Sequence, residues 1–415
     1  MSKQDKWLLP EGIEELLPPA ARKLECARRE LLDMFASWGY ELIMPPFIEY
    51  LESLLTGTGN DLDLQTFKLT DQLTGRMMGV RADMTPQAAR IDAHHLKREA
   101  PSRLCYVGTV LRTRSDGFAA SRSPLQVGAE LFGHAGIESD VEILSLVLET
   151  LSLMSIEEVH VDLGHVGIFR GLASEAGLDA RQETDLFDAL QRKAVTEIED
   201  ILSSCNAGQA QRQRLAALAG LNGGAGVLEA AREQLAGAGD AVIAALNNLC
   251  AIAEAMQSRV GKARLYFDLA ELRAYNYQTG MSFAVFVPGR GQEIVRGGRY
   301  DDIGQVFGRA RPATGFSTDL KTLMDISSRD FGPRQGVILA SRGVAACAQR
   351  RCARIIVAER ATDETTVSEE AAVHREIGAI LGLAAGAQGA VGRDALCEGS
   401  AEDASGALAS QTVQA

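Results

Sequence analysis

The chain has 415 residues, of which 46% are hydrophobic and 23% charged, and this composition excludes a fibrous or wholly disordered protein. The net charge of −13 argues against a large nucleic-acid-binding surface, because such a surface needs clustered Lys and Arg to neutralise phosphates. The length suffices for two or three domains around a substantial core.

Targeting signals and cysteine usage indicate a cytoplasmic protein. The segment before Ala20 is charged and broken by prolines, and no apolar run reaches membrane-spanning length. The seven cysteines are scattered and never spaced as C-x-x-C. We therefore expect reduced thiols, with neither a disulfide framework nor a metal site.

The first part of the chain alternates helical and β-rich segments. Residues 20–39 carry apolar side chains at helical spacing and end in glycine, as many helices do. The next segment, YELIMPPFIEY, is β-rich up to Pro45 and Pro46, which confine strand pairing to an edge. An alternating pattern that turns at Thr74 and Gly75 then predicts an antiparallel hairpin.

The core continues with one helix and two strands. Residues 82–99 show helical spacing, with Pro86 tolerated in the first turn. Two strands follow, RLCYVGTVLRTR and LQVGAELFG, and they are joined by a loop with arginines on both sides. A helix over 138–153 and a strand in EEVHVDLGHV come next.

An insertion interrupts this pattern. Residues 170–260 are rich in Ala, Leu and Gln with glycine breaks, which predicts a helical insertion within a core that spans 1–330. Beyond it, RLYFDLAEL, MSFAVFVPG and EIVRGG are typical of antiparallel strands, before a helix over 318–326. The predicted class is α+β, an antiparallel sheet flanked by helices.

The C-terminal segment differs in kind. After Phe331 there is no Phe, Tyr, Trp or Met, so little buried area is available to offset the entropy of ordering. We expect residues 331–415 to be a poorly defined, disordered tail with one strand at ARIIVAE and one amphipathic helix over 367–383. A native extension and the product of a shifted reading frame are both compatible with this composition.

Three segments carry a resemblance to a known family. They are VRADMTPQAAR at 80–90, YVGTVLRTR and SPLQVGAELFG within 106–133, and IVRGGRYDDIGQVFG and PATGFSTDL within 294–320. Together with the order of elements, they resemble the catalytic core of class II aminoacyl-tRNA synthetases, and specifically the histidyl-tRNA synthetase branch. The resemblance covers about residues 8–330 and implies the class II synthetase-like fold.

The resemblance also implies a histidine-binding pocket. An amino acid's ammonium needs acceptors, and its carboxylate needs a cation. Asp83, an aspartate where the family usually has glutamate, and Thr85 match the residues beside the ammonium. Arg273 matches the residue near the carboxylate. Tyr275 and Tyr277 match the tyrosines that line the imidazole pocket. The complete matching set is Asp83, Thr85, Arg112, Gln126, Glu130, Arg273, Tyr275 and Tyr277.

The same residues are also compatible with ordinary structural roles. Asp83 precedes Thr-Pro, a pattern typical of a helix N-cap. Gln126 and Glu130 could be solvated on one strand face, and Arg273 could pair with a surface carboxylate. Gly315 fits either a strand bulge or a point of close backbone approach.

The nucleotide-binding positions of the family are altered. Arg112 matches one ATP-clamping arginine and could instead face the amino-acid carboxylate. Arg114 stands where the family has a glutamate, and Thr322 where it has its last arginine. Because that arginine holds phosphate through charge-assisted hydrogen bonds, its loss should lower adenylate formation by orders of magnitude.

This combination, with no recognisable anticodon-binding domain, resembles the regulatory subunits of ATP phosphoribosyltransferase. The resemblance implies a non-catalytic subunit without a cofactor, a short-form catalytic partner for the first step of L-histidine biosynthesis, and L-histidine as ligand. It also implies self-association as a dimer through residues 20–46. An active histidyl-tRNA synthetase and a stand-alone histidine- or RNA-binding module are the alternatives.

Overall fold

A computed structural model describes residues 7–56, 60–115, 121–271, 278–332, 338–340 and 355–357. The chain divides into two compact units, residues 1–332 and 333–415. Within the described ranges, no helix combines the length and apolar character that crossing a membrane requires.

A nine-stranded mixed sheet forms the centre of the first unit, with the strand order β1-β5-β6-β12-β11-β10-β7-β9-β8. Neighbouring strands from β5 to β7 in this order all pair antiparallel, which confirms the predicted α+β class with an antiparallel core. The strands are β1 Glu41–Leu42, β5 Ser102–Thr109, β6 Leu125–Phe132, β7 His160–His165, β8 Asn222–Gly223, β9 Arg264–Asp268, β10 Met281–Phe286, β11 Val295–Arg299 and β12 Ala313–Asp319.

Two strand pairs run parallel. β9, in the segment RLYFDLAEL, pairs parallel with β7, and β1 pairs parallel with β5. The antiparallel assignment of β9 holds for its pairing with β8 but is wrong for its pairing with β7, because the chain passes through several helices between β7 and β9. Such a crossover brings the second strand back in the same direction as the first.

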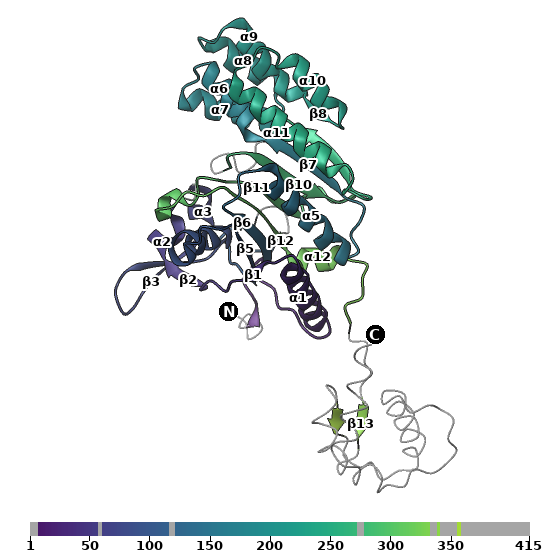
Figure 1. The fold of residues 1–415 in the computed structure, drawn as a ribbon. Coiled ribbons are helices and arrows are strands. Elements are labelled where there is room, and N and C mark those ends of the chain that lie inside the picture. Colours follow the sequence, from purple (N-terminus) through teal and green to yellow (C-terminus); the bar gives the residue numbers. More distant parts are fainter. Residues whose placement is uncertain are drawn as a thin grey trace, which may run out of the picture. The chain divides into compact units, whose positions relative to one another are not determined.

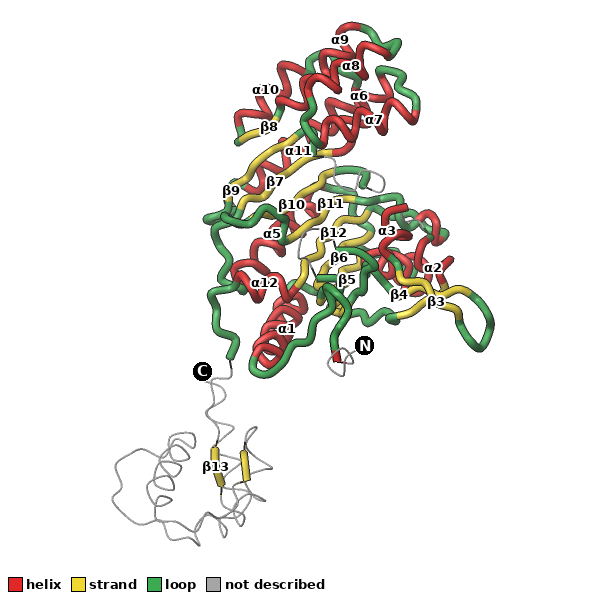
Figure 2. Tube along the Cα trace, turned by 180° about the vertical axis from the view of Figure 1, so that it is seen from behind, coloured by secondary structure: helices red, strands yellow, loops and turns green. Residues whose placement is uncertain are grey.

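Three helices cover one face of the sheet (Figure 1), and the strands are seen from the opposite side in Figure 2. They are α1 Ala20–Ser37, α5 Ile137–Leu153 and α12 Leu320–Ile326, and all three were predicted. α1 buries the apolar stripe that its spacing indicated, including Leu31 and Phe35. The helices contact β5, β12 and β6, so the central strands are held rigidly from this side.

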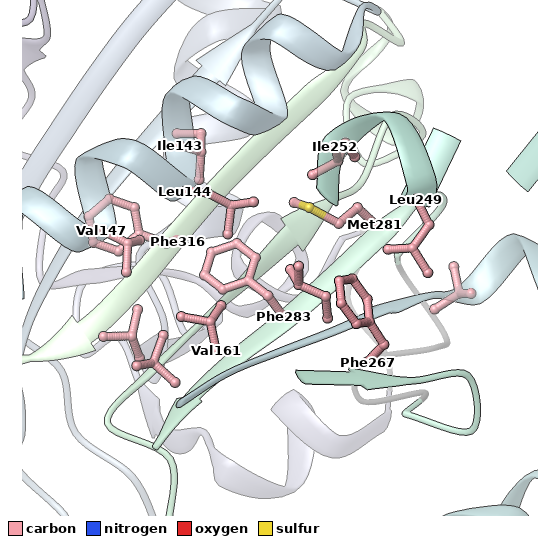
Figure 3. Packing of buried hydrophobic residues seen from close by; sticks show 14 of the residues in the cluster. Ile143, Leu144, Val147, Val161, Leu249, Ile252, Phe267, Met281, Phe283 and Phe316 are labelled. Carbon is pink, nitrogen blue, oxygen red and sulfur yellow. The ribbon is translucent and has the colours of Figure 1, made fainter. Parts of the chain in front are cut away.

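The core lies between these helices and the sheet. Figure 3 shows Leu144 and Val147 of α5 near Phe316 of β12 and Phe283 of β10, and Leu249 of α11 farther along the same cluster, beyond Met281. All five side chains are buried. Burial of large apolar side chains is the main stabilising term for this framework.

The range expected to be a helical insertion is occupied by helices, which Figure 1 shows gathered at the β7–β9 end of the sheet. A buried apolar stripe on α11 packs onto β7 and α5. The limits 170–260, as boundaries of a domain, stay a prediction. The helices are α6 Val166–Glu175, α7 Ala180–Gln191, α8 Val195–Ser204, α9 Gln209–Ala217, η3 Leu218–Gly220, α10 Gly226–Gln234 and α11 Asp240–Met256.

A second, three-stranded sheet has the order β2-β4-β3. Its strands β3 Phe67–Thr70 and β4 Met77–Val80 form the predicted hairpin. The strand expected up to Pro45 is much shorter than predicted, since only β1 is regular before the chain leaves the large sheet. Prolines lack the N–H that a ladder requires. β2 Ile48–Tyr50 then pairs with β4, beside α2 Leu51–Leu55 and α3 Asn60–Gln65.

The helix predicted over 82–99 has two parts. α4 spans Thr85–Arg90 with Pro86 in its first turn, as expected, and it continues as a π-helix, η2 Ile91–Leu96. A short 3-10 helix, η4 Gln305–Phe307, lies between β11 and β12. Through α4, the residues that follow β4 are placed against β6.

In the second unit, β14 Ile355–Val357 confirms the strand predicted at ARIIVAE, and it pairs parallel with β13 Ile338–Ala340, which was not predicted. The helix predicted over 367–383 lies outside the described residues. The expectation of a disordered tail therefore stays a prediction.

Candidate functional site

Glu130 lies at the centre of a buried polar network on β6. Its side chain is 1% exposed. Tyr106 of β5 donates its hydroxyl to Oε1 of Glu130 at 2.8 Å, and Tyr300, which follows β11, donates to Oε2. Three separate strands of the sheet thus converge on one carboxyl group.

The start of α4 completes the network. Gln126, buried on β6, donates its Nε2 to Oδ1 of Asp83 at 2.9 Å and accepts the backbone N–H of Met84 at its Oε1, also at 2.9 Å. The Thr85 hydroxyl lies 3.0 Å from the hydroxyl of Tyr106. Asp83, Thr85, Gln126 and Glu130, predicted from two separate segments, therefore form one continuous cluster.

The structure bears differently on the ordinary structural roles that the sequence left open for Asp83, Gln126 and Glu130. Asp83 accepts the backbone N–H of Thr85, the first residue of α4, at 2.8 Å and also faces Gln126, but the N-cap residue of α4 is Met84. The solvated alternative for Gln126 and Glu130 is wrong, because both are buried. Both side chains occupy the protein interior, where an unpaired polar group is costly.

The electrostatics of the cluster are unusual. Within the described ranges, neither Asp83 nor Glu130 forms an ion pair with Lys, Arg or His. Burial raises the pKa of the Glu130 carboxyl to about 8, although the hydroxyls of Tyr300 and Tyr106 act to lower it and Asp83 raises it further. The site therefore holds two neighbouring carboxyl groups, and a bound cation would favour the ionised form of Glu130.

Gly315 fits directly against this network. It lies opposite Glu130 in the regular pairing of β12 with β6, so it is not a bulge. A methyl group at this position would overlap Oε2 of Glu130 and crowd the carbonyl oxygen of Ala129. The close-approach interpretation of this glycine is correct.

A cavity of about 610 Å³ opens beside the cluster, and Gln126 and Arg112 belong to its wall. The Arg112 side chain also donates to the backbone oxygen of Ala82, next to Asp83, at 3.3 Å. Its guanidinium is therefore anchored between the cavity and the first residues of α4. This places a cation beside Ala82, the residue that precedes Asp83.

Asp319, Lys321 and Thr322, the positions of the altered last motif, also line the cavity. The Thr322 hydroxyl donates to Asp319 at 3.0 Å, and Nζ of Lys321 donates to the backbone oxygen of Ser123 at 2.9 Å. The Asp319 carboxylate also accepts the backbone N–H of Leu125 at 2.9 Å. These side chains bind one another and the backbone. Arg114 is exposed.

Three predicted residues, Arg273, Tyr275 and Tyr277, lie outside the described residues. Two residues of the network were missed, Tyr106 and Tyr300. Each stands in a quoted segment, YVGTVLRTR or RGGRYDD. The apolar neighbours of Tyr106 would have been a usable signal, whereas Tyr300 stands between Arg299 and Asp301. Among the described residues, no group of His, Cys, Asp and Glu is arranged to hold a metal ion.

Comparisons with known proteins show the family and the fold. The family model for histidyl-tRNA synthetase matches residues 12–323. ATP phosphoribosyltransferase regulatory subunits of Thioalkalivibrio sulfidiphilus and Alkalilimnicola ehrlichii are 62% and 57% identical, over 83% and 89% of this chain and 86% and 91% of theirs.

Two solved structures share the fold. An ATP phosphoribosyltransferase regulatory subunit/histidyl-tRNA synthetase from Bacillus halodurans has a TM-score of 0.75 at 27% identity, covering 88% of this chain and 96% of its own. Histidyl-tRNA synthetase from Nostoc has a TM-score of 0.69 at 17% identity, over 88% and 89% of the two chains, which shows the fold alone. The chain belongs to the family of ATP phosphoribosyltransferase regulatory subunits, built on the fold of histidyl-tRNA synthetase.

Proposed function

We propose that this chain is a non-catalytic regulatory subunit that binds free L-histidine and acts on a short-form ATP phosphoribosyltransferase catalytic subunit. The transfer reaction, the first step of L-histidine biosynthesis, belongs to the partner. The names of its relatives, which are regulatory subunits of that enzyme, support this role.

The observation that carries the ligand assignment is the pair of carboxyl groups of Asp83 and Glu130, which have no cationic partner among the described residues. Buried carboxylates are normally paired with a cation or a metal. A ligand ammonium would satisfy Asp83, and an imidazole N–H would satisfy Glu130. L-Histidine carries both groups.

The remaining part of the ligand is its carboxylate. Arg112 is the described cation that borders both the cavity and the first residues of α4. A guanidinium holds a carboxylate with two parallel hydrogen bonds, which fixes its orientation. Arg273, Tyr275 and Tyr277 complete the proposed set, from the match to the family.

The nucleotide end of the cavity supports a role without adenylate chemistry. Phosphoryl chemistry requires fixed cations around the transferring groups. Here Thr322 is bound to Asp319, and Lys321 is bound to Ser123. Neither offers the forked donor that an arginine would supply at position 322.

Regulation requires that histidine bind one state of the assembly more tightly than another. A ligand with equal affinity for both states shifts nothing. The coupling is reciprocal, so the catalytic partner must change histidine affinity by the factor by which histidine changes partner binding.

Self-association as a dimer belongs to the same proposal. β1 is an edge strand of only two residues, and four apolar side chains near it are exposed. We call these the edge patch: Leu42, Met44, Phe47 and Ile48, which are 43%, 79%, 41% and 41% exposed. Exposed apolar side chains grouped along an edge strand are typical of a surface that another chain covers.

The test of the ligand site is calorimetric titration of L-histidine into the full chain and into its Glu130→Ala and Asp83→Asn variants. Removing one partner of a buried charged contact costs about 2–5 kcal/mol, so each variant should lose most of its binding heat. Glu199→Gln, a change at an exposed residue of α8, is the matched control and should bind normally.

The same titration is repeated with the short catalytic subunit present, while its activity is followed. Histidine should inhibit the wild-type complex and fail to inhibit the Glu130→Ala complex at the same concentration. Equal histidine affinity in wild type and both variants would remove this pocket from the proposal.

A further inference from the structure

Helix α4 contacts both the proposed ligand site and the small three-stranded sheet. Its first residues belong to the proposed ligand site, through Asp83 and Thr85. Its last turn packs against β2, the strand of the small sheet whose first residue, Ile48, belongs to the edge patch. One short helix, buried on most of its positions, therefore touches both places.

The contact with β2 is a three-residue cluster. Nε2 of Gln87 donates to Oε1 of Glu49 at 2.6 Å and to the backbone oxygen of Pro46 at 2.9 Å. Nη2 of Arg90 donates to the same Oε1 of Glu49 at 2.6 Å. The Glu49 side chain is 9% exposed and that of Arg90 16%, so solvent screens this ion pair only weakly.

The cluster is incompletely satisfied. Oε1 of Gln87 and Nε of Arg90 are buried and have no hydrogen-bond partner in the described part of the chain. A buried polar atom without a partner costs free energy, so an arrangement that pairs it lies close in energy. Both unpaired atoms belong to side chains of α4 that hold Glu49.

The far end of the helix is fixed. α4 runs directly into the π-helix η2, a local widening of the helix that is frequent at functional sites. Asp92 of η2 accepts two hydrogen bonds from the buried guanidinium of Arg311, at 2.9 and 3.0 Å. Because η2 is anchored and α4 is short, a ligand that fixes the start of α4 also restricts its last turn.

We infer that α4 is the relay between the ligand site and the edge patch, and that the contacts of Gln87 and Arg90 with Glu49 transmit ligand occupancy to β2. The inference rests on the proposed function, because it takes L-histidine as the ligand. A ligand held at Asp83 fixes the start of α4, and the cluster then fixes Glu49 and its neighbour Ile48.

The experiment compares amide hydrogen exchange of residues 47–50 with and without L-histidine, in the full chain and in Glu49→Gln and Gln87→Met. In wild type, histidine should slow this exchange by about fivefold or more, the lower range of allosteric coupling. In both variants the slowing should disappear. Histidine affinity, measured by calorimetry, should remain within about threefold of wild type, below that range.

Glu52→Gln is the matched control. It makes the same carboxylate-to-amide change in an exposed ion pair with Arg76, beside the same small sheet. It should keep the histidine response of the wild type. Gln87→Met serves as the second variant if Glu49→Gln does not fold.

The outcomes separate the two proposals. If wild type binds no histidine, the proposed ligand site fails and the relay fails with it. If wild type binds histidine but exchange at 47–50 is unchanged, or if it slows equally in the folded variants, only the relay is overturned.

Discussion

Gly315 on β12 lies opposite Glu130 on β6, so close that a methyl group would occupy the place of a Glu130 carboxyl oxygen. Neither residue can be understood alone. Glycine at 315 makes room for the carboxyl group, and the carboxyl group in turn fills the space that the missing side chain leaves.

Gly315→Ala should therefore expel the Glu130 side chain from its position between Tyr106 and Tyr300. We expect histidine affinity to fall by at least about tenfold, equal to roughly 1.4 kcal/mol. Calorimetric titration measures the effect. Gly220→Ala, where no atom lies near the added methyl group, is the control, and an unchanged affinity in Gly315→Ala would contradict the assigned geometry.

Glu130 should make stability depend on pH. Its pKa is about 8 in the folded chain and about 4.3 in an unfolded one. Between these values the folded chain keeps a proton that the unfolded chain has released, so the free energy of unfolding falls as pH rises from about 5 to about 8. The contribution is at most about 1.4 kcal/mol per pH unit.

Urea unfolding of the ligand-free chain at several pH values tests this dependence. Glu130→Gln should show a shallower fall in stability than wild type, while Glu199→Gln, at an exposed position of α8, should follow wild type. Parallel curves for wild type and Glu130→Gln would show that Glu130 is not the titrating group.

Asp92→Asn should destabilise the chain. The change leaves the buried Arg311 guanidinium without its carboxylate, and breaking a buried pair typically costs about 3–5 kcal/mol. Denaturant unfolding measures the loss. Glu52→Gln, in an exposed pair with Arg76, should change stability by less than about 0.5 kcal/mol.

Met44→Glu should weaken self-association. The change places a charge in the edge patch, where covering it with a second chain would require its desolvation. Sedimentation equilibrium should show a shift from dimer toward monomer. Val195→Glu, at an exposed apolar residue of α8, should leave the association state unchanged. A monomeric wild type would overturn the dimer itself.

Adenylate formation should be absent. With threonine at 322 and Lys321 bound to the backbone of Ser123, position 322 no longer supplies the forked cation that holds phosphate in the family. Histidine-dependent exchange of pyrophosphate into ATP measures this step. Turnover at ordinary synthetase rates would contradict the non-catalytic role.

The sequence by itself determined the elements and the polar residues of the site. Helical spacing located α1 and α5, and the hairpin of β3 and β4 followed from alternation and a glycine turn. Local patterns suffice there because each depends on side chains a few positions apart. The departures from the family pattern at Arg114 and Thr322 could likewise be identified from the sequence, because each is a single position within a segment that resembles the family.

Only the tertiary structure decided how these pieces meet. The parallel pairing of β9 with β7 depends on a crossover through six intervening α-helices, which no local pattern records. The roles of Tyr106 and Tyr300 depend on three strands converging on Glu130. Burial of that carboxyl group, which raises its pKa, is a property of the packed sheet and of the space left by Gly315.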